Sequence, residues 1–159
     1  MIISPDYDSF ARAYERGEPQ IVSTRLVADL ETPVSAKLKL ARNARYSFLL
    51  ESVEGGAVRG RYSIIGLNPD LIWKVENGKA SINRKAGLDP DGFFEDTGLH
   101  PLASLRALLA ESRIKLPEDA PPMAAGVFGY MGYDMVRFME ELPEPNPDTL
   151  GLPDSMMIR

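Results

Sequence analysis

The sequence predicts an α+β fold in which an antiparallel β-sheet packs against three or four helices. Two turn signals predict strand pairs: Glu54-Gly55-Gly56 separates two short apolar runs, and Asn77-Gly78 separates residues 70–76 from residues 79–84. Glycine accepts the positive φ that tight hairpins require, and Asn-Gly is typical of a type I′ turn. Other stretches carry apolar residues at helical spacing, and these supply the helices.

Four segments begin with residues that helices prefer at their N-termini. A small polar residue caps free backbone N–H groups, and proline fits the first helical position. A stripe of leucines in the third helix predicts burial against the sheet. The expected helices are one that Ser4 caps and Gly17 ends, residues 34–44 after Thr32-Pro33, one from Pro101 with Leu102, Leu105, Leu108 and Leu109 as its stripe, and residues 134–141 with Asp134 as N-cap.

Residues 126–134 combine glycines and aromatic residues in an expected strand. Gly126, Gly129 and Gly132 lack the spacing of a dinucleotide-binding fingerprint, and the lysine of a P-loop is missing. Glycine inside a strand is typical of a bulge or of a close backbone approach. We therefore interpret the segment as structural, with aromatic residues that pack on the strand; these are Phe128, Tyr130 and Tyr133.

The remaining elements are two strands and a loop. Alternation over residues 19–28 predicts one strand, and the apolar run within residues 154–159 predicts another, whose continuation we expect beyond this chain. Trp73 is expected in the core of the sheet. Residues 86–98 are rich in turn formers and acids, which predicts a surface loop; Asp89 and Asp91 there lack the full spacing of a calcium loop.

Composition narrows the classes of function. The 159 residues carry a formal net charge of -5, and nucleic-acid-binding proteins instead present basic surfaces. There is no cysteine, and His100 is the one histidine, so disulfides, thiolate zinc sites and serine–histidine dyads are disfavoured. The sequence has neither an apolar run of about 20 residues nor the basic start of a signal peptide. We expect a cytoplasmic protein.

The hairpin expected around Glu54-Gly55-Gly56 supplies the candidate binding site. Its turn brings Glu51 and Ser52, at the end of one apolar run, towards Arg61-Tyr62-Ser63, at the start of the next. A carboxylate, a hydroxyl, an arginine and an aromatic ring together can bind a small zwitterion such as an amino acid. A plain surface hairpin is the alternative.

Three segments resemble the anthranilate synthase component I family, the large chorismate-binding subunits of the first enzyme of tryptophan biosynthesis. They are Leu49-Leu50-Glu51-Ser52 with GRYSIIG at residues 60–66, GVFGYMGYD at residues 126–134, and LPDSMMIR at residues 152–159. The resemblance implies that residues 1–159 are the amino-terminal region and that the catalytic chorismate-binding domain lies outside this chain. On this basis the fold would form part of a larger two-layer enzyme.

The resemblance also implies a reaction and its control. The whole enzyme would convert chorismate and ammonia into anthranilate and pyruvate with Mg²⁺, the ammonia coming from a glutamine amidotransferase subunit, component II. L-Tryptophan would inhibit it by feedback. We expect no catalytic residue and no metal ligand within residues 1–159, so this fragment alone should be inactive.

By the same resemblance, the hairpin lines a pocket for L-tryptophan. Ser52 is the first candidate for the polar head of the ligand, Glu51 would pair with its α-ammonium group, and Leu50 would offer a backbone or apolar contact. Arg61, Tyr62 and Ser63 follow, with Arg61 expected to brace Glu51 or the hairpin. The rest of the pocket would come from the carboxy-terminal part of the longer protein.

Two alternatives stay open. The large subunit of aminodeoxychorismate synthase, from folate synthesis, is a relative that tends to carry aspartate at the position of Glu51. The other alternative is a stand-alone amino-acid-binding module.

Overall fold

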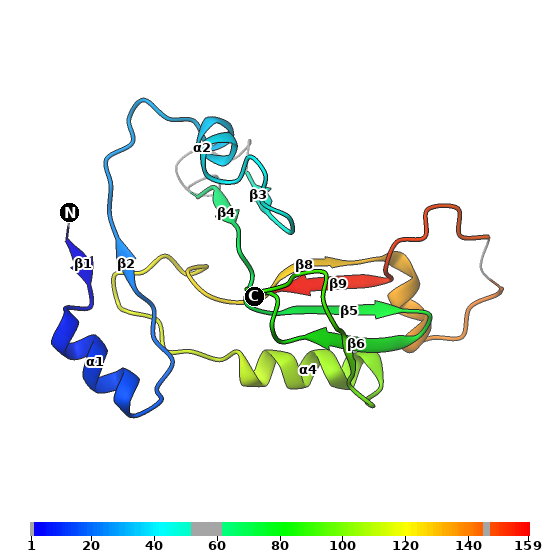
Figure 1. The fold of residues 1–159 in the computed structure, drawn as a ribbon. Helices are drawn as coiled ribbons and strands as arrows, with labels where there is room; N and C mark the ends of the chain where they lie inside the picture. The colour runs from blue at the N-terminus through cyan, green and yellow to red at the C-terminus, as the bar shows by residue number, and fades with distance from the viewer. Residues whose placement is uncertain (1, 52–61, 145–146) are drawn as a thin grey trace.

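The computed structural model describes residues 2–51, 62–144 and 147–159, and its fold is α+β, as predicted (Figure 1). Every strand pair in this part of the chain is antiparallel. The main sheet has five strands in the order β7-β6-β5-β9-β8. Their bounds are Ile72–Glu76 for β5, Lys79–Asn83 for β6, Glu95–Asp96 for β7, Phe128–Met131 for β8 and Ser155–Ile158 for β9.

The β5–β6 hairpin confirms the Asn77-Gly78 prediction. Both turn residues have positive φ, 50° and 76°, as a type I′ turn requires. Strand β9 lies between β5 and β8, so that Trp73 faces Met157 in one ladder and Gly129 faces Met157 in the other. The centre of the sheet therefore joins segments more than 80 residues apart.

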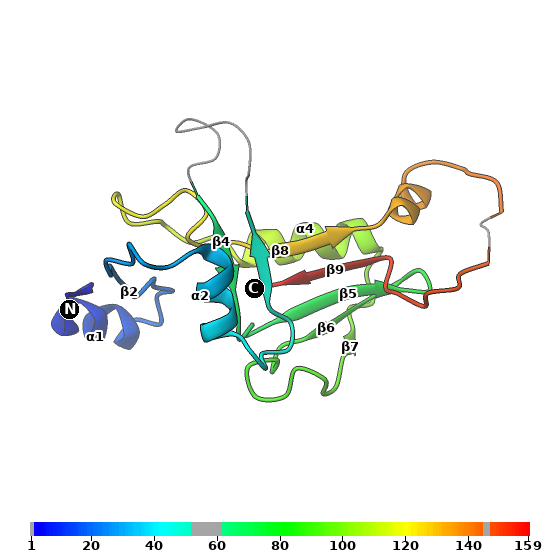
Figure 2. The same ribbon diagram turned by 90° about the horizontal axis from the view of Figure 1, so that it is seen from above.

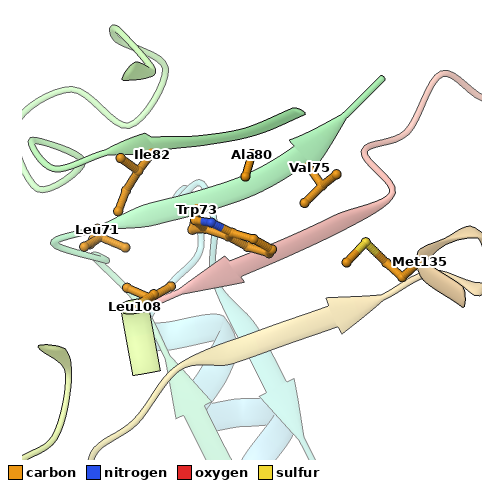
Figure 3. Packing of buried hydrophobic residues seen from close by; sticks show 7 residues of the cluster. All are labelled: Leu71, Trp73, Val75, Ala80, Ile82, Leu108 and Met135. Carbon is orange, nitrogen blue, oxygen red and sulfur yellow. The ribbon is translucent and has the colours of Figure 1, made fainter. Parts of the chain in front are cut away.

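Helix α4, Pro101–Glu111, runs along one face of this sheet (Figure 1). Trp73 is fully buried there, and its indole Nε1 donates a hydrogen bond of 2.9 Å to Ser104 Oγ. The expected leucine stripe holds only in part, because Leu109 is 47% exposed and Ser104 is buried instead. The core between the helix and the sheet, shown in Figure 3, consists of Leu71, Trp73, Val75, Ala80, Ile82, Leu108 of α4 and Met135 of the segment after β8.

A second pair of strands, β3 (Phe48–Leu50) and β4 (Ile64–Gly66), lies beside the β8–β9 end of the main sheet (Figure 2). Helix α2, Pro33–Leu40, leads into it. A capping box opens α2: Thr32 Oγ1 accepts from Ser35 N, and Ser35 Oγ accepts from Thr32 N. The helix start is confirmed, but the helix ends four residues earlier than expected.

The N-terminal segment differs most from the prediction. Helix α1 is Tyr7–Glu15, and Asp6 caps it in place of Ser4 because its carboxylate accepts from Ser9 N. Gly17, with φ 68°, ends the helix as predicted. The strand expected over residues 19–28 shrinks to β2, Ser23–Thr24, which pairs with β1, Ile3–Ser4.

Gly129 in strand β8 and Gly132 directly after it allow close backbone approach, as interpreted from the sequence. A Cβ at Gly129 would overlap the carbonyl oxygen of Met156 in β9, and one at Gly132 would lie 2.8 Å from Asp154 O. The aromatic prediction holds less well, because Tyr133 is 81% exposed.

The segment after β8 is the 3₁₀ helix η1, Tyr133–Phe138, with Gly132 as N-cap; the prediction of Asp134 as N-cap was wrong. The Asp134 carboxylate instead accepts from Arg137 Nε at 2.8 Å. Loop 86–98 was expected to be irregular, yet it contains β7, which pairs with β6.

Candidate functional site

The candidate site lies at one end of the β3–β4 pair. Leu50 is the last residue of β3 and pairs with Ile64, the first residue of β4. Glu51 directly follows Leu50, and Tyr62 and Ser63 directly precede Ile64. Four of the six expected site residues therefore belong to the same end of one strand pair. Ser52, Arg61 and the predicted turn at Glu54-Gly55-Gly56 lie outside the described residues.

Phe48 fixes this strand pair to the main sheet. Its register partner in β4 is Gly66, where a Cβ would overlap the Phe48 ring. On the β8 side, the Phe48 and Phe128 rings stack with centroids 5.0 Å apart. The last glycine of the GRYSIIG segment thus has a steric role: it leaves room for the ring that joins the two sheets.

A groove with a volume of about 310 Å³ opens between β3 and the β8–β9 strands. This volume is at the lower end of the range of about 300–1,000 Å³ that is usual for small-molecule sites. Most of the lining is apolar, and Leu50, 48% exposed, connects it with the end of the strand pair. The lining residues are Tyr46, Ser47, Phe48, Leu50, Phe128, Gly129, Tyr130, Met156 and Ile158.

The groove uses the face of the main sheet that α4 leaves open. Successive side chains of a strand point to opposite faces, so Met156 and Ile158 face away from Met157, which packs on the α4 core. Phe128 and Tyr130 share the groove face of β8. The sheet therefore has its hydrophobic core on one side and the candidate site on the other.

Tyr46 stands at the edge of the groove in an unusual backbone conformation, with φ 53°. Its hydroxyl donates a hydrogen bond of 2.9 Å to Asp91 Oδ1, and Asp91 also forms an ion pair with Arg45. Burial raises the pKa of Tyr46, and the hydrogen bond to Asp91 raises it further. Asp91, which the sequence places in an expected surface loop, thus contacts Tyr46 in the wall of the groove.

Tyr130 is held to the entrance of β9. Its hydroxyl donates to Pro153 O at 2.9 Å, while its own carbonyl accepts from Ser155 Oγ at 2.8 Å. Burial, followed by the charges of Asp154 and Glu76, raises the pKa of Tyr130. The Leu-Pro-Asp-Ser segment thereby positions one wall of the groove.

Sequence reasoning missed several of the groove residues. Tyr46, Phe48, Met156 and Ile158 were not among the candidates, and Phe128 and Tyr130 were interpreted as packing residues only. The alternation of Phe48 and Leu50 would have indicated a shared strand face, but Tyr46 precedes β3 and has a left-handed backbone conformation. No sequence signal predicts that β9 would bring Met156 beneath them.

Two further observations concern metals and membranes. Within residues 2–51, 62–144 and 147–159, no group of three or more histidine or acidic side chains is placed to hold a metal ion. None of the helices in the same ranges has the length and apolar character needed to cross a bilayer.

Comparison with known proteins supports the resemblance seen in the motifs. A protein of Cereibacter sphaeroides named anthranilate synthase component 1 is 55% identical over 153 residues, which cover 96% of this chain. The chain is homologous to anthranilate synthase component 1. Proteins of the same name from Thermus thermophilus and Mycolicibacterium smegmatis are 42% and 40% identical and match 83% and 86% of the chain. No family model matches the chain.

The chain spans only 30%, 26% and 25% of the lengths of these three anthranilate synthase component 1 proteins. Their similarity supports the family resemblance over the matched part of each protein. The candidate groove is built by residues 46–50, 128–130 and 156–158, all within this chain.

Proposed function

We propose that residues 1–159 are the amino-terminal regulatory region of an anthranilate synthase component I. The complete protein, called here the longer subunit, would convert chorismate and ammonia to anthranilate and pyruvate. A glutamine amidotransferase, component II, would supply the ammonia. Mg²⁺ would act as a Lewis acid on the substrate, and we place its ligands, like the catalytic residues, outside this chain. Support comes from the similarity to three proteins of that name, at 40–55% identity.

The role of this region would be to bind L-tryptophan as a feedback inhibitor. The observation that carries this proposal is the convergence of Leu50, Glu51, Tyr62 and Ser63 on one end of the β3–β4 pair, next to an apolar groove. An aromatic amino acid needs both features, because its ring must leave water while its charged head stays hydrogen-bonded.

Glu51 is suited to the charged head of the ligand. It is exposed at the end of β3, directly after the groove residue Leu50. A carboxylate there would pair with the α-ammonium group, and charge-assisted hydrogen bonds are about twice as strong as neutral ones. Ser52, the next residue, remains the first candidate for a hydroxyl contact, with Arg61 as a brace.

Inhibition would follow from linkage between two sites. If L-tryptophan favours a conformation with low affinity for chorismate, chorismate must disfavour L-tryptophan by the same factor. The β3–β4 pair suits such a response because, among the described residues, its contact with the main sheet includes the stacked rings of Phe48 and Phe128.

Two alternative functions stay open. An aminodeoxychorismate synthase subunit would share the fold, but the relatives compared above are named anthranilate synthase component 1. A stand-alone amino-acid-binding module would bind L-tryptophan without any catalytic extension.

A substitution of Ser52 tests the proposal. In the longer subunit, Ser52→Phe should abolish inhibition by L-tryptophan, because the larger side chain would occupy the space of the amino-acid head. Ser23→Phe, at an exposed position of β2, is the matched control and should keep normal inhibition. Unchanged inhibition in Ser52→Phe would contradict the proposed pocket.

A further inference from the structure

We propose that the groove between β3 and the β8–β9 strands receives the aromatic side chain of the ligand, and that Tyr46 is its specificity-determining wall. This inference rests on the proposed function and extends it to residues outside the LLES and GRYSIIG segments. It assigns ring recognition to the groove and head-group recognition to the end of the β3–β4 pair.

The backbone of Tyr46 is the first observation. With φ 53°, this residue occupies the left-handed region, which costs free energy for any side chain larger than glycine. A tyrosine in such a conformation must be held by its surroundings. Residues in this state concentrate at ligand-binding sites, where their side chains are aimed in a way that regular structure does not allow.

The hydrogen bonds of Tyr46 are the second observation. Its hydroxyl donates to Asp91 Oδ1 at 2.9 Å, and Arg45 pairs with the same carboxylate. Asp91 is anchored in a loop that the Asn83 side chain fixes by donating to Asp89 O at 2.8 Å. The ring of Tyr46 is therefore fixed from both ends, by its backbone and by its hydroxyl.

The rest of the groove matches an aromatic occupant. Phe48 and Phe128 form one stacked pair, and Met156 adds a polarisable thioether. Aromatic rings gain from stacked or edge-to-face neighbours, and methionine sulfur makes favourable contacts with ring edges. A flat indole that lies between Tyr46 and the residues Phe48, Phe128 and Met156 would leave water and contact aromatic rings and a sulfur atom on several sides.

A fixed wall has a consequence for specificity. A groove whose width is set by Tyr46 should favour the bicyclic indole over a single phenyl ring, because the smaller ring leaves part of the lining without contacts. Removal of the Tyr46 ring should weaken the binding of L-tryptophan more than the binding of L-phenylalanine. Removal of its hydroxyl alone should have a smaller effect, since the ring remains but loses its anchor to Asp91.

Calorimetry on the longer subunit tests this with L-tryptophan and L-phenylalanine as the two titrants. Tyr46→Ala should weaken the binding of L-tryptophan at least 10-fold, in line with the loss of an aromatic contact. It should also reduce the preference for L-tryptophan over L-phenylalanine at least 3-fold. Tyr46→Phe should weaken the binding of L-tryptophan about 2- to 5-fold, as expected for the loss of one hydrogen bond, here the one from Tyr46 to Asp91. Tyr14→Ala is the control, because Tyr14 is a 72% exposed tyrosine on α1.

The outcomes separate the two proposals. The role of Tyr46 is overturned if Tyr46→Ala binds L-tryptophan as tightly as the wild type and with the same preference over L-phenylalanine, and if Tyr46→Phe also keeps the wild-type affinity. The proposed function would still stand. No binding of L-tryptophan by the wild type overturns both. If Tyr46→Ala fails to fold, Tyr46→Phe decides alone, and an affinity equal to that of the wild type counts against the inference.

Discussion

The Phe48 ring is enclosed between Gly66, its partner across the β3–β4 ladder, and the Phe128 ring of β8, whose centroid is 5.0 Å away. This arrangement joins the strand pair that carries the expected ligand residues to the sheet that supplies the groove. It also explains why glycine occupies position 66, the last residue of the GRYSIIG segment, because any side chain there would displace the Phe48 ring.

Gly66→Ala should therefore destabilise the protein. The added Cβ overlaps the Phe48 ring, and overpacking of this kind costs about 1–3 kcal/mol. Urea unfolding measures the change. The control is Gly87→Ala, where the nearest atom would be 3.7 Å from the new Cβ and the free energy of unfolding should change by less than about 1 kcal/mol. Equal costs for the two variants would rule out the steric role of Gly66.

Gly129→Ala should be more damaging than Gly66→Ala. At position 129 the new Cβ meets the backbone of Met156 and Met157, which cannot rotate away as a phenylalanine ring can. We expect a loss of about 3 kcal/mol or more and weakened pairing between β8 and β9. Hydrogen exchange of the β9 amides, compared with those of β6, reports the pairing. A loss smaller than that of Gly66→Ala would contradict the assigned backbone contact.

Ser104→Ala should remove the acceptor for the buried Trp73 indole. An unsatisfied buried N–H costs about 1–3 kcal/mol. Unfolding can be followed by the fluorescence of Trp73, the single tryptophan of the sequence. A double-mutant cycle with Trp73→Phe, followed by circular dichroism, is the control: once the indole is gone, Ser104→Ala should cost at least about 1 kcal/mol less. Equal costs in both backgrounds would show that the hydrogen bond contributes nothing.

The ion pair between Arg84, which directly follows β6, and Glu111, the last residue of α4, should give an acid-sensitive contribution to stability. Arg84 donates two hydrogen bonds to Glu111, at 2.8 and 2.9 Å, and these lower the pKa of Glu111 below its usual 4.5. Because the folded-state pKa is the lower one, the stabilisation is present above pH 4.5 and is lost as the pH falls through the folded-state value.

Glu111→Gln measures this contribution. Arg84 is 54% exposed, so solvent screening limits the effect at pH 7 to about 0.5 kcal/mol. The variant should also lose less stability than the wild type between pH 5 and pH 3 (approximate limits of the carboxylate range). Parallel pH profiles for the two proteins would refute the contribution of the pair.

The sequence predicted those elements whose signals are local. Thr32-Pro33, Gly17 and Asn77-Gly78 each act within a few residues, and each appears where expected. The N-cap at Ser4 failed because Asp6 is in place to accept from Ser9 N. The strand over residues 19–28 failed because an alternating pattern needs a partner along its length, and β1 offers only two residues.

The site was predicted only where it is continuous in sequence. Leu50, Glu51, Tyr62 and Ser63 were named as candidates because the sequence predicts one hairpin there, and the structure places all four at one end of the β3–β4 pair. Their role in binding stays a prediction. The groove was missed because its walls come from residues 46–50, 128–130 and 156–158, and no local signal states that β9 inserts beside β8. Tyr46 was missed for a further reason: its partner Asp91 lies 45 residues away in an acidic loop.

The claim that this region binds L-tryptophan through Glu51 is tested by calorimetric titration of L-tryptophan into the longer subunit, as the wild type and as Glu51→Gln. The wild type should bind one L-tryptophan per chain, and Glu51→Gln should weaken it at least about 10-fold, the loss of one charge-assisted hydrogen bond. The claim is wrong if L-tryptophan gives no binding heat with the wild type, or if Glu51→Gln binds L-tryptophan with unchanged affinity.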